Sequence, residues 1–200
     1  FIEGSSGNDL IGPFESPLWF KSNGGNDHIL GSPKDDMIHL ESGRNKVETY
    51  GGDDKIYLNS WGSQLDAGIG DDILYIELHT SYDIVIDTQS EIIYRENLLS
   101  SFNNEIKAFE SVDAGESSSN FNIISTDGIH AIKTGTGDDA VSVSNYTVDL
   151  DGGEGSDTLI FESSGFNEVQ IINLGDGIYQ SQSGREAGTL VNFENVEIVG

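Results

Sequence analysis

The sequence predicts an all-β fold, a solenoid of short parallel strands in which two blocks of repeats are each followed by longer, non-repetitive strands. Three observations predict it. A large apolar residue recurs at every ninth position, a cluster of glycines precedes most of these apolar residues, and an aspartate often stands between the two. A spacing of nine does not match the 3.6-residue period of a helix, and a disordered acidic chain would not maintain it.

The apolar column defines the strands. When GGEGSDTLI (152–160) is numbered as positions one to nine, position eight is apolar in nine consecutive nonapeptides of the first block: Ile2, Ile11, Phe20, Ile29, Ile38, Val47, Ile56, Leu65 and Leu74. In the second block it reads Ile123, Ile132, Val141, Leu150 and Leu159. Each apolar residue lies between two mixed residues, which predicts a short strand with one inward side chain. Because the register already includes Ile2, we expect the array to begin upstream of this segment.

The glycine clusters define the turns. They stand at GSSGND (4–9), NGGND (23–27), GGDD (51–54), GIGDD (68–72), GTGDD (135–139) and GGEGSD (152–157). Glycine tolerates positive φ angles and a close approach of neighbouring backbone, so these segments predict tight turns. Gly-Asp pairs also occur in hairpins, and an antiparallel sandwich is therefore an alternative. The unbroken period of nine favours the solenoid.

Composition narrows the class of partner. The chain has 35 acidic and 9 basic residues, a formal net charge of −26, and no cysteine. Such a negative field repels nucleic acid and anionic lipid. No apolar run approaches the roughly 18 residues that span a membrane, so we expect no membrane insertion by this segment.

No signal peptide is visible, and a chain that starts at Phe1 is expected to be a piece of a larger protein. Without disulfides, a secreted domain needs another stabiliser, and bound metal is a candidate.

The repeats resemble the RTX (hemolysin-type) calcium-binding nonapeptide family, GGxGxDxUx. The match is complete at 152–160 and nearly complete at 4–12, 67–75 and 134–142. The resemblance implies a right-handed parallel β-roll in which two nonapeptides form one turn. It also implies that calcium lies in the turns, bound by the position-six carboxylates and by carbonyl oxygens of the glycine segments.

The resemblance assigns the metal ligands residue by residue. They are Asp9, Asp27, Asp36, Asp54, Asp72, Asp139 and Asp157, with the turn glycines Gly25, Gly52, Gly68, Gly70, Gly135, Gly137, Gly153 and Gly155. With two nonapeptides per turn, residues 18 apart stack about 4.8 Å apart. The expected sites therefore lie between residues 9 and 27, 36 and 54, 54 and 72, and 139 and 157, with the last pair the strongest candidate.

Charge repulsion connects these sites to folding. Each stacked carboxylate pair costs on the order of 3 kcal/mol without metal, and a domain is stable by only about 5–15 kcal/mol. The apo chain is therefore expected to be unfolded. Calcium takes six to eight oxygen ligands, which suits glycine turns with aspartate better than the ligand sets of magnesium or zinc.

Several nonapeptides depart from the pattern. Segment 13–21 has neither a glycine turn nor an acid at position six, so no site is expected there. Pro33 and Lys34 stand in the turn that precedes Asp36, which disfavours a complete site. Asn45 and Ser63 would be weak ligands.

The chain contains an internal duplication. Residues 65–76 match 150–161, and 106–115 parallel 190–200. We therefore divide the chain into a first block with its trailing strands, 1–115, and a second block with its trailing strands, 116–200, joined in one continuous solenoid. The alternative is that the two endings are merely similar strands. A further alternative places a short helix within 87–105.

The function expected from the sequence is non-enzymatic, because no catalytic motif or basic groove is present. The favoured hypothesis is a monomeric calcium-binding module that folds outside the cell and acts as a spacer in a secreted or cell-surface adhesin or toxin. Its parent protein would contact a host cell or a glycan. The second hypothesis is a carbohydrate-binding accessory module of a secreted polysaccharide-modifying enzyme. Trp19 and Trp61 are its candidate aromatic residues, although Trp19 can instead pack the irregular turn beside Phe14.

Overall fold

The computed structural model describes residues 1–96, 103–125, 128–143, 148–162, 170–181 and 188–199, and all regular structure in these residues is β-strand. The alternative helix within 87–105 is wrong where it can be compared, since 92–95 and 104–107 are strands and 97–102 lie outside the described residues. The Asp87 carboxylate accepts the N–H groups of Gln89 and Ser90, which stabilises a turn instead of a helix. The described part of the chain accordingly has no helix capable of crossing a membrane.

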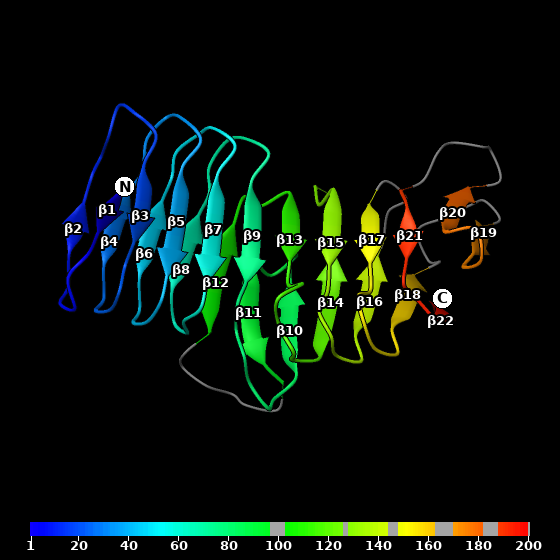
Figure 1. The fold of residues 1–200 in the computed structure, drawn as a ribbon. Helices are drawn as coiled ribbons and strands as arrows, with labels where there is room; N and C mark the ends of the chain where they lie inside the picture. Colours follow the sequence, from blue (N-terminus) through cyan, green and yellow to red (C-terminus); the bar gives the residue numbers. More distant parts are fainter. Residues whose placement is uncertain (97–102, 126–127, 144–147, 163–169, 182–187, 200) are drawn as a thin grey trace.

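The strands form two long sheets and one small one (Figure 1). The nine-stranded sheet contains, in spatial order, β1 (Ile2–Glu3), β3 (Trp19–Lys21), β5 (Met37–Leu40), β7 (Lys55–Leu58), β9 (Ile73–Ile76), β13 (Ser111–Asp113), β15 (Ala131–Lys133), β17 (Asp149–Asp151) and β21 (Leu190–Val191). The eleven-stranded sheet contains β2 (Leu10–Ile11), β4 (His28–Leu30), β6 (Lys46–Glu48), β8 (Gln64–Asp66), β12 (Asn104–Lys107), β11 (Ile92–Arg95), β10 (Ile84–Asp87), β14 (Phe121–Ser125), β16 (Ala140–Val143), β18 (Thr158–Glu162) and β22 (Asn195–Val199).

Within the repeats, successive strands alternate between the two long sheets, and each pairs in parallel with the strand two further along the chain. Ile38 in β5 pairs with Ile56 in β7, which pairs with Leu74 in β9, so partners are 74 − 56 = 56 − 38 = 18 residues apart. Ile123 in β14 pairs with Val141 in β16 at the same interval. The predicted spacing of two nonapeptides therefore sets the strand register.

One strand inside the long sheets departs from the parallel arrangement. β11 is antiparallel to both β10 and β12, so a hairpin is inserted into the eleven-stranded sheet after the first block. The sequence counterpart of β10 in the second half is β19 (Gln170–Asn173), which pairs antiparallel with β20 (Ile178–Ser181) in a separate two-stranded sheet. Of the trailing strands expected after each block, β10 thus continues a long sheet, whereas β19 lies in a separate one.

The duplicated endings lie on opposite sheets. Residues 111–113 follow β9 in the nine-stranded sheet, whereas their counterparts at 195–199 follow β18 in the eleven-stranded sheet. The repeats are exchanged in the same way: Leu65 lies in β8 of the eleven-stranded sheet, whereas its counterpart Leu150 lies in β17 of the nine-stranded sheet. The duplication therefore preserves local structure but not position.

The core consists of one continuous cluster of apolar side chains between the two long sheets. The position-eight residues supply most of it, and Ile29, Ile38, Ile56, Leu74 and Leu159 have no exposed surface. Burial of such a side chain contributes about 1.5–3 kcal/mol, so an array of these residues is the main source of stability. The core occupies the interior and leaves the turns along both edges as the places where polar groups gather.

Candidate metal centre

A ladder of backbone-to-carboxylate hydrogen bonds runs through the turns. The N–H of Asp36 donates to Oδ1 of Asp54 at 2.7 Å, and the N–H of Asp54 donates to Oδ1 of Asp72 at 2.8 Å. The remaining expected pairs are joined in the same way, Asp9 N–H to Asp27 at 3.0 Å and Asp139 N–H to Asp157 at 2.9 Å. The structure therefore brings together all four predicted pairs, each through one carboxylate oxygen.

The second carboxylate oxygen of five of these aspartates is buried without a hydrogen-bond partner. The five are Asp27, Asp54, Asp72, Asp139 and Asp157, and their side chains are exposed by 2 % at most. A buried carboxylate oxygen that lacks a donor carries a large desolvation cost unless a cation balances it. An unpaired carboxylate oxygen recurs at five equivalent positions, which indicates that these oxygens have a function.

Burial also shifts the acidity of these groups. It raises the pKa of Asp54 to about 7 and those of Asp72 and Asp157 to about 6, and repulsion from neighbouring acids adds to the shift. Burial likewise raises the pKa of Asp27 and Asp139. Desolvation raises these pKa values more than the repulsion between stacked carboxylates does. Repulsion, the only cause that the sequence predicted, is therefore the smaller of the two. Without a cation, these turns hold carboxylates that are costly to ionise.

Asp9 and Asp36 differ from the other five. The Ser32 N–H donates to Oδ2 of Asp36 at 2.7 Å, and the Ser32 hydroxyl donates to Oδ1 at 2.8 Å. Ser5 contacts Asp9 in the same way, with its N–H at 2.7 Å from Oδ2 and its hydroxyl at 2.9 Å from Oδ1. Both oxygens of each carboxylate therefore have protein donors.

The predicted glycines bring successive turns into close contact. A methyl group on Gly155 would overlap the carbonyl oxygen of Gly137, and one on Gly70 would overlap that of Gly52. The same holds for Gly25, Gly52, Gly68, Gly135, Gly137 and Gly153, each of which abuts backbone of the preceding rung. Positive φ explains only some of them: Gly25, Gly52, Gly68, Gly153 and Gly155 have it, whereas Gly70, Gly135 and Gly137 do not. Close approach is thus the shared requirement.

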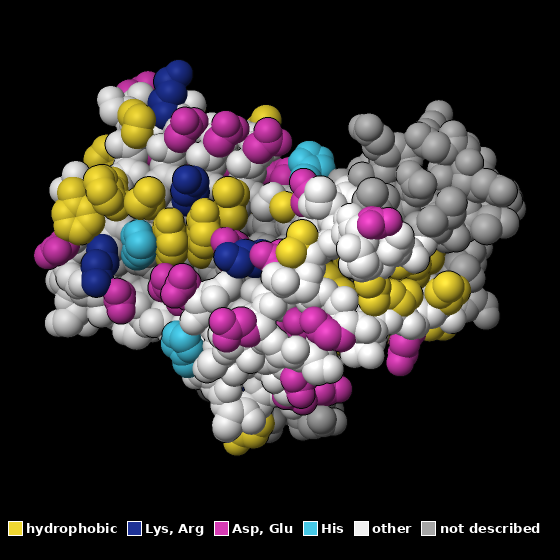
Figure 2. All heavy atoms as spheres, turned by 45° about the vertical axis from the view of Figure 1, so that its right-hand side comes forward, with side chains coloured by type: hydrophobic (Ala, Val, Ile, Leu, Met, Phe, Trp, Pro, Cys, Tyr) yellow, Lys and Arg dark blue, Asp and Glu magenta, His cyan; other side chains and the backbone are white. Residues whose placement is uncertain are grey.

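A second ladder follows the outside of the turns, one residue before the buried aspartates. The Asp53 N–H donates to Oδ1 of Asp35 at 3.0 Å, and the Asp71 N–H donates to Oδ1 of Asp53 at 3.1 Å. Asp138 accepts the Ser156 N–H at 3.0 Å. Figure 2 shows acidic side chains at regular intervals along one edge of the molecule. These exposed carboxylates add negative potential beside the buried ones.

Sequence reasoning missed the residues that end the ladders. Oε2 of Glu110 accepts the Asp72 N–H at 2.9 Å, and Oε2 of Glu194 accepts the Asp157 N–H at 2.8 Å. On the same edge as Asp157, before strands of the eleven-stranded sheet, Asn104 accepts the Ser63 N–H at 2.8 Å. The two glutamates stand at matching places in the duplicated endings AFESV and NFENV, and that parallel was the signal that could have identified them.

The donor set fits a hard cation. Within the described residues, no group of three or more His, Cys, Asp or Glu side chains converges on a metal position, so carboxylates alone do not form a cage. The turns offer unpaired Asp oxygens, and backbone carbonyl oxygens such as those of Gly52 and Gly137 lie where successive turns meet. A mixture of carboxylate and carbonyl oxygens is the set that calcium prefers. It suits zinc poorly, because zinc favours Cys and His.

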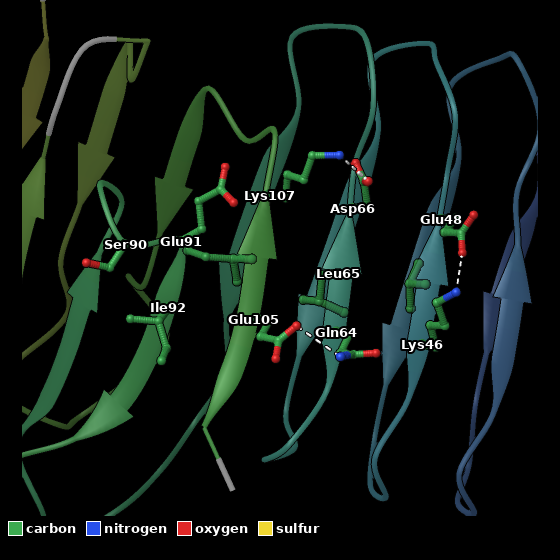
Figure 3. A pocket seen from close by; sticks show the side chains of 12 residues that line it. Lys46, Glu48, Gln64, Leu65, Asp66, Ser90, Glu91, Ile92, Glu105 and Lys107 are labelled. Atoms are coloured by element: carbon green, nitrogen blue, oxygen red, sulfur yellow. Dashed lines mark hydrogen bonds and ion pairs between the residues drawn. The ribbon is translucent and has the colours of Figure 1, made fainter. Parts of the chain in front are cut away.

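A polar groove on the outer face of the eleven-stranded sheet is a weaker candidate. It encloses about 680 Å³ between β6, β8, β12 and the turn after β10 (Figure 3). Four of its charged groups form two ion pairs, Lys46 with Glu48 and Lys107 with Asp66, each at 2.6 Å, and the Gln64 amide donates to Glu105. No side chain that lines the groove has a buried polar atom without a partner, in contrast to the aspartates of the turns.

Comparison with known proteins gives no relative: no family model, no curated protein and no solved structure matches the chain.

Proposed function

We propose that this chain is a calcium-binding, right-handed parallel β-roll of the RTX type that folds when its turns bind calcium. The observation that carries the proposal is the set of five buried aspartates, each with one oxygen that lacks a protein partner. The ligands would be Asp27, Asp54, Asp72, Asp139 and Asp157, with carbonyl oxygens of the glycine turns. Calcium would neutralise carboxylates whose burial is otherwise unfavourable.

The proposal places the module outside the cell, as a non-catalytic and monomeric spacer of a secreted or surface-bound adhesin or toxin. Extracellular calcium modules bind with dissociation constants of about 10⁻⁴–10⁻³ M, which fits sites made largely of carbonyl oxygens. At the low calcium concentration of the cytosol the buried carboxylates would be unneutralised, and the chain would stay unfolded. Outside the cell, calcium would complete the fold.

Circular dichroism with and without millimolar calcium tests the proposal, combined with a calcium titration by calorimetry. We expect β structure and cooperative unfolding in calcium, and loss of both in chelator. Complete β structure and unchanged stability in chelator would remove the folding switch. Absence of calcium binding at millimolar concentration would remove the proposed function as a whole.

A second candidate function is glycan binding on the outer face of the nine-stranded sheet. Trp19 is 53 % exposed on this face. His39, Tyr57 and Tyr75 form a stack there, with ring centroids 4.0 and 4.4 Å apart. Trp61 is less suitable, because the Arg95 guanidinium lies 4.6 Å from its ring centroid and covers one face. Tryptophan fluorescence of the calcium-loaded protein, titrated with neutral and acidic oligosaccharides, tests this role, and a lack of response to every sugar would remove it.

A further inference from the structure

The turns that end in a position-six aspartate fall into two kinds. Open turns leave one aspartate oxygen without a partner: 23–27, 50–54, 68–72, 135–139 and 153–157. Closed turns, 5–9 and 32–36, begin with a serine that donates to both oxygens of the aspartate four residues later. All seven turns end in the same residue type, so the aspartate alone does not determine the kind.

We propose that Ser5 and Ser32 take the place of calcium at Asp9 and Asp36, so that the two closed turns fold without metal and calcium binds only at the open turns. This inference rests on the proposed function, since it specifies which turns of the same array take the cation. Ser5 and Ser32 are thus the residues that determine where calcium binds.

A comparison of donors supports the substitution of serine for metal. Asp36 receives the Leu18 N–H at 2.6 Å, the Ser32 N–H at 2.7 Å and the Ser32 hydroxyl at 2.8 Å. For Asp54, the Oδ1 atom accepts the Asp36 N–H, whereas Oδ2 has no partner, because the neighbouring Thr49 hydroxyl donates to the Ala67 carbonyl at 2.6 Å. Both aspartates are almost fully buried, at 2 % and 0 % exposure. A carboxylate that is already satisfied by hydrogen bonds offers a cation less than one with an unpaired oxygen.

Backbone conformation distinguishes the closed turns from four of the five open ones, whereas Gly135, which begins the fifth, has no positive φ. The first residue has a left-handed conformation in four of the open turns, at Asn23, Tyr50, Gly68 and Gly153. Ser5 and Ser32 have no such conformation. Pro33 also disfavours helical backbone angles at Ser32 and favours an extended one. The serine turns present the N–H of their first residue to the carboxylate, which the left-handed turns do not.

Two neutral turns, on the edge where the chain passes from the nine-stranded to the eleven-stranded sheet, likewise satisfy their own polar groups. Asn45 stands at position six, and its Nδ2 donates to the Ser42 carbonyl at 3.3 Å. In the next rung, the hydroxyls of Ser60 and Ser63 are hydrogen-bonded at 3.2 Å. Among the four position-six residues stacked on this edge in the first block, Asp27 is the one that keeps an unpaired buried oxygen. A serine-containing turn can therefore satisfy its own position-six residue without an ion.

A reciprocal exchange of turn residues tests the inference. Turns 32–36 (SPKDD) and 68–72 (GIGDD) lie on the same edge and both end in Asp-Asp. The forward variant carries Ser32→Gly, Pro33→Ile and Lys34→Gly, and the reverse variant carries Gly68→Ser, Ile69→Pro and Gly70→Lys. Equilibrium dialysis at saturating calcium, followed by elemental analysis, gives the number of ions bound per chain.

We expect the forward variant to bind one more calcium ion per chain than the wild type, and the reverse variant to bind one fewer. Because any side chain placed at Gly70 would approach the Gly52 carbonyl, the reverse variant can fail to fold, and the forward variant then decides. Lys34→Gly alone is the matched control: it removes the same positive charge but keeps Ser32, so the number of ions should not change.

The outcomes distinguish this inference from the proposed function. A wild type that binds calcium, with a forward variant that binds no more, overturns the role of serine but leaves the calcium module intact. A wild type that binds no calcium overturns the proposed function. If the forward variant alone then gained an ion, the role of serine would still hold. An extra ion in Lys34→Gly would attribute the gain to charge and overturn the role of serine.

Discussion

Asp54→Asn should stabilise the protein in chelator and destabilise it in calcium. The substitution keeps the shape of the side chain and the oxygen that accepts the Asp36 N–H. It replaces the unpaired Oδ2 by an amide nitrogen and removes the charge. In chelator the Asp54 carboxylate is buried with no cation to neutralise it. In calcium the same carboxylate would bind the ion. The sign of the effect therefore depends on the metal.

The magnitude follows from the acidity of Asp54. Burial raises its pKa from 3.8 to about 7, and at about 1.4 kcal/mol for each pKa unit the ionised form costs up to about 4 kcal/mol above pH 7. The new amide N–H₂ lacks an acceptor, which costs about 1–3 kcal/mol. We therefore expect a net stabilisation of about 1–3 kcal/mol in chelator at pH 8.

Urea unfolding followed by circular dichroism, in chelator and in millimolar calcium, measures both signs. If the wild type is unfolded in chelator, an added osmolyte brings both proteins into a measurable range. Asp36→Asn is the matched control on the same edge. Its two oxygens accept donors from Leu18 and Ser32, so the substitution should destabilise under both conditions. An Asp54→Asn variant that is less stable than the wild type in chelator would refute the reasoning.

Three further predictions follow. In chelator, stability should fall as pH rises from about 4 to 7, because the folded state keeps protons on carboxyls whose pKa values are raised to about 6–7. Thermal unfolding between pH 5 and 8 checks this, and greater stability at pH 8 would contradict it. Glu110→Ala should cost about 1–2 kcal/mol in urea unfolding by leaving the Asp72 N–H without its acceptor, whereas Glu110→Gln should cost less. Gly70→Ala should lower the midpoint of urea unfolding by forcing a methyl group against the Gly52 carbonyl, while Gly7→Ala, with no such contact, should be tolerated.

The strands were predictable because the pattern is local and repeated. Ile38, Ile56 and Leu74 pair in register at an interval that could be counted directly along the chain. The inserted hairpin of β10 and β11 was not predictable in this way. Its strands lie outside the nine-residue period, and their antiparallel pairing depends on contacts with β12 and β14.

The candidate site was predictable in part. The position-six aspartates and their partners were identified from spacing, and the structure brings each pair together. Spacing did not reveal that Glu110 and Glu194 end the ladders, because long connections separate them in sequence from Asp72 and Asp157. Pro33 and Lys34 were the reason to disfavour a complete site in turn 32–36, but the residue that contacts the carboxylate is Ser32.

The sequence by itself determined the two-nonapeptide interval, the apolar column that lines the core, and the glycines at which neighbouring turns meet. These follow from residue types repeated at a fixed spacing, since every rung meets the same neighbours. Only the tertiary structure decided which aspartates keep an unpaired oxygen. GSSGND at 4–9 and NGGND at 23–27 read almost alike, yet Asp9 is satisfied by Ser5 and Asp27 is not. The difference depends on where an N–H and a hydroxyl point, and backbone conformation sets that direction.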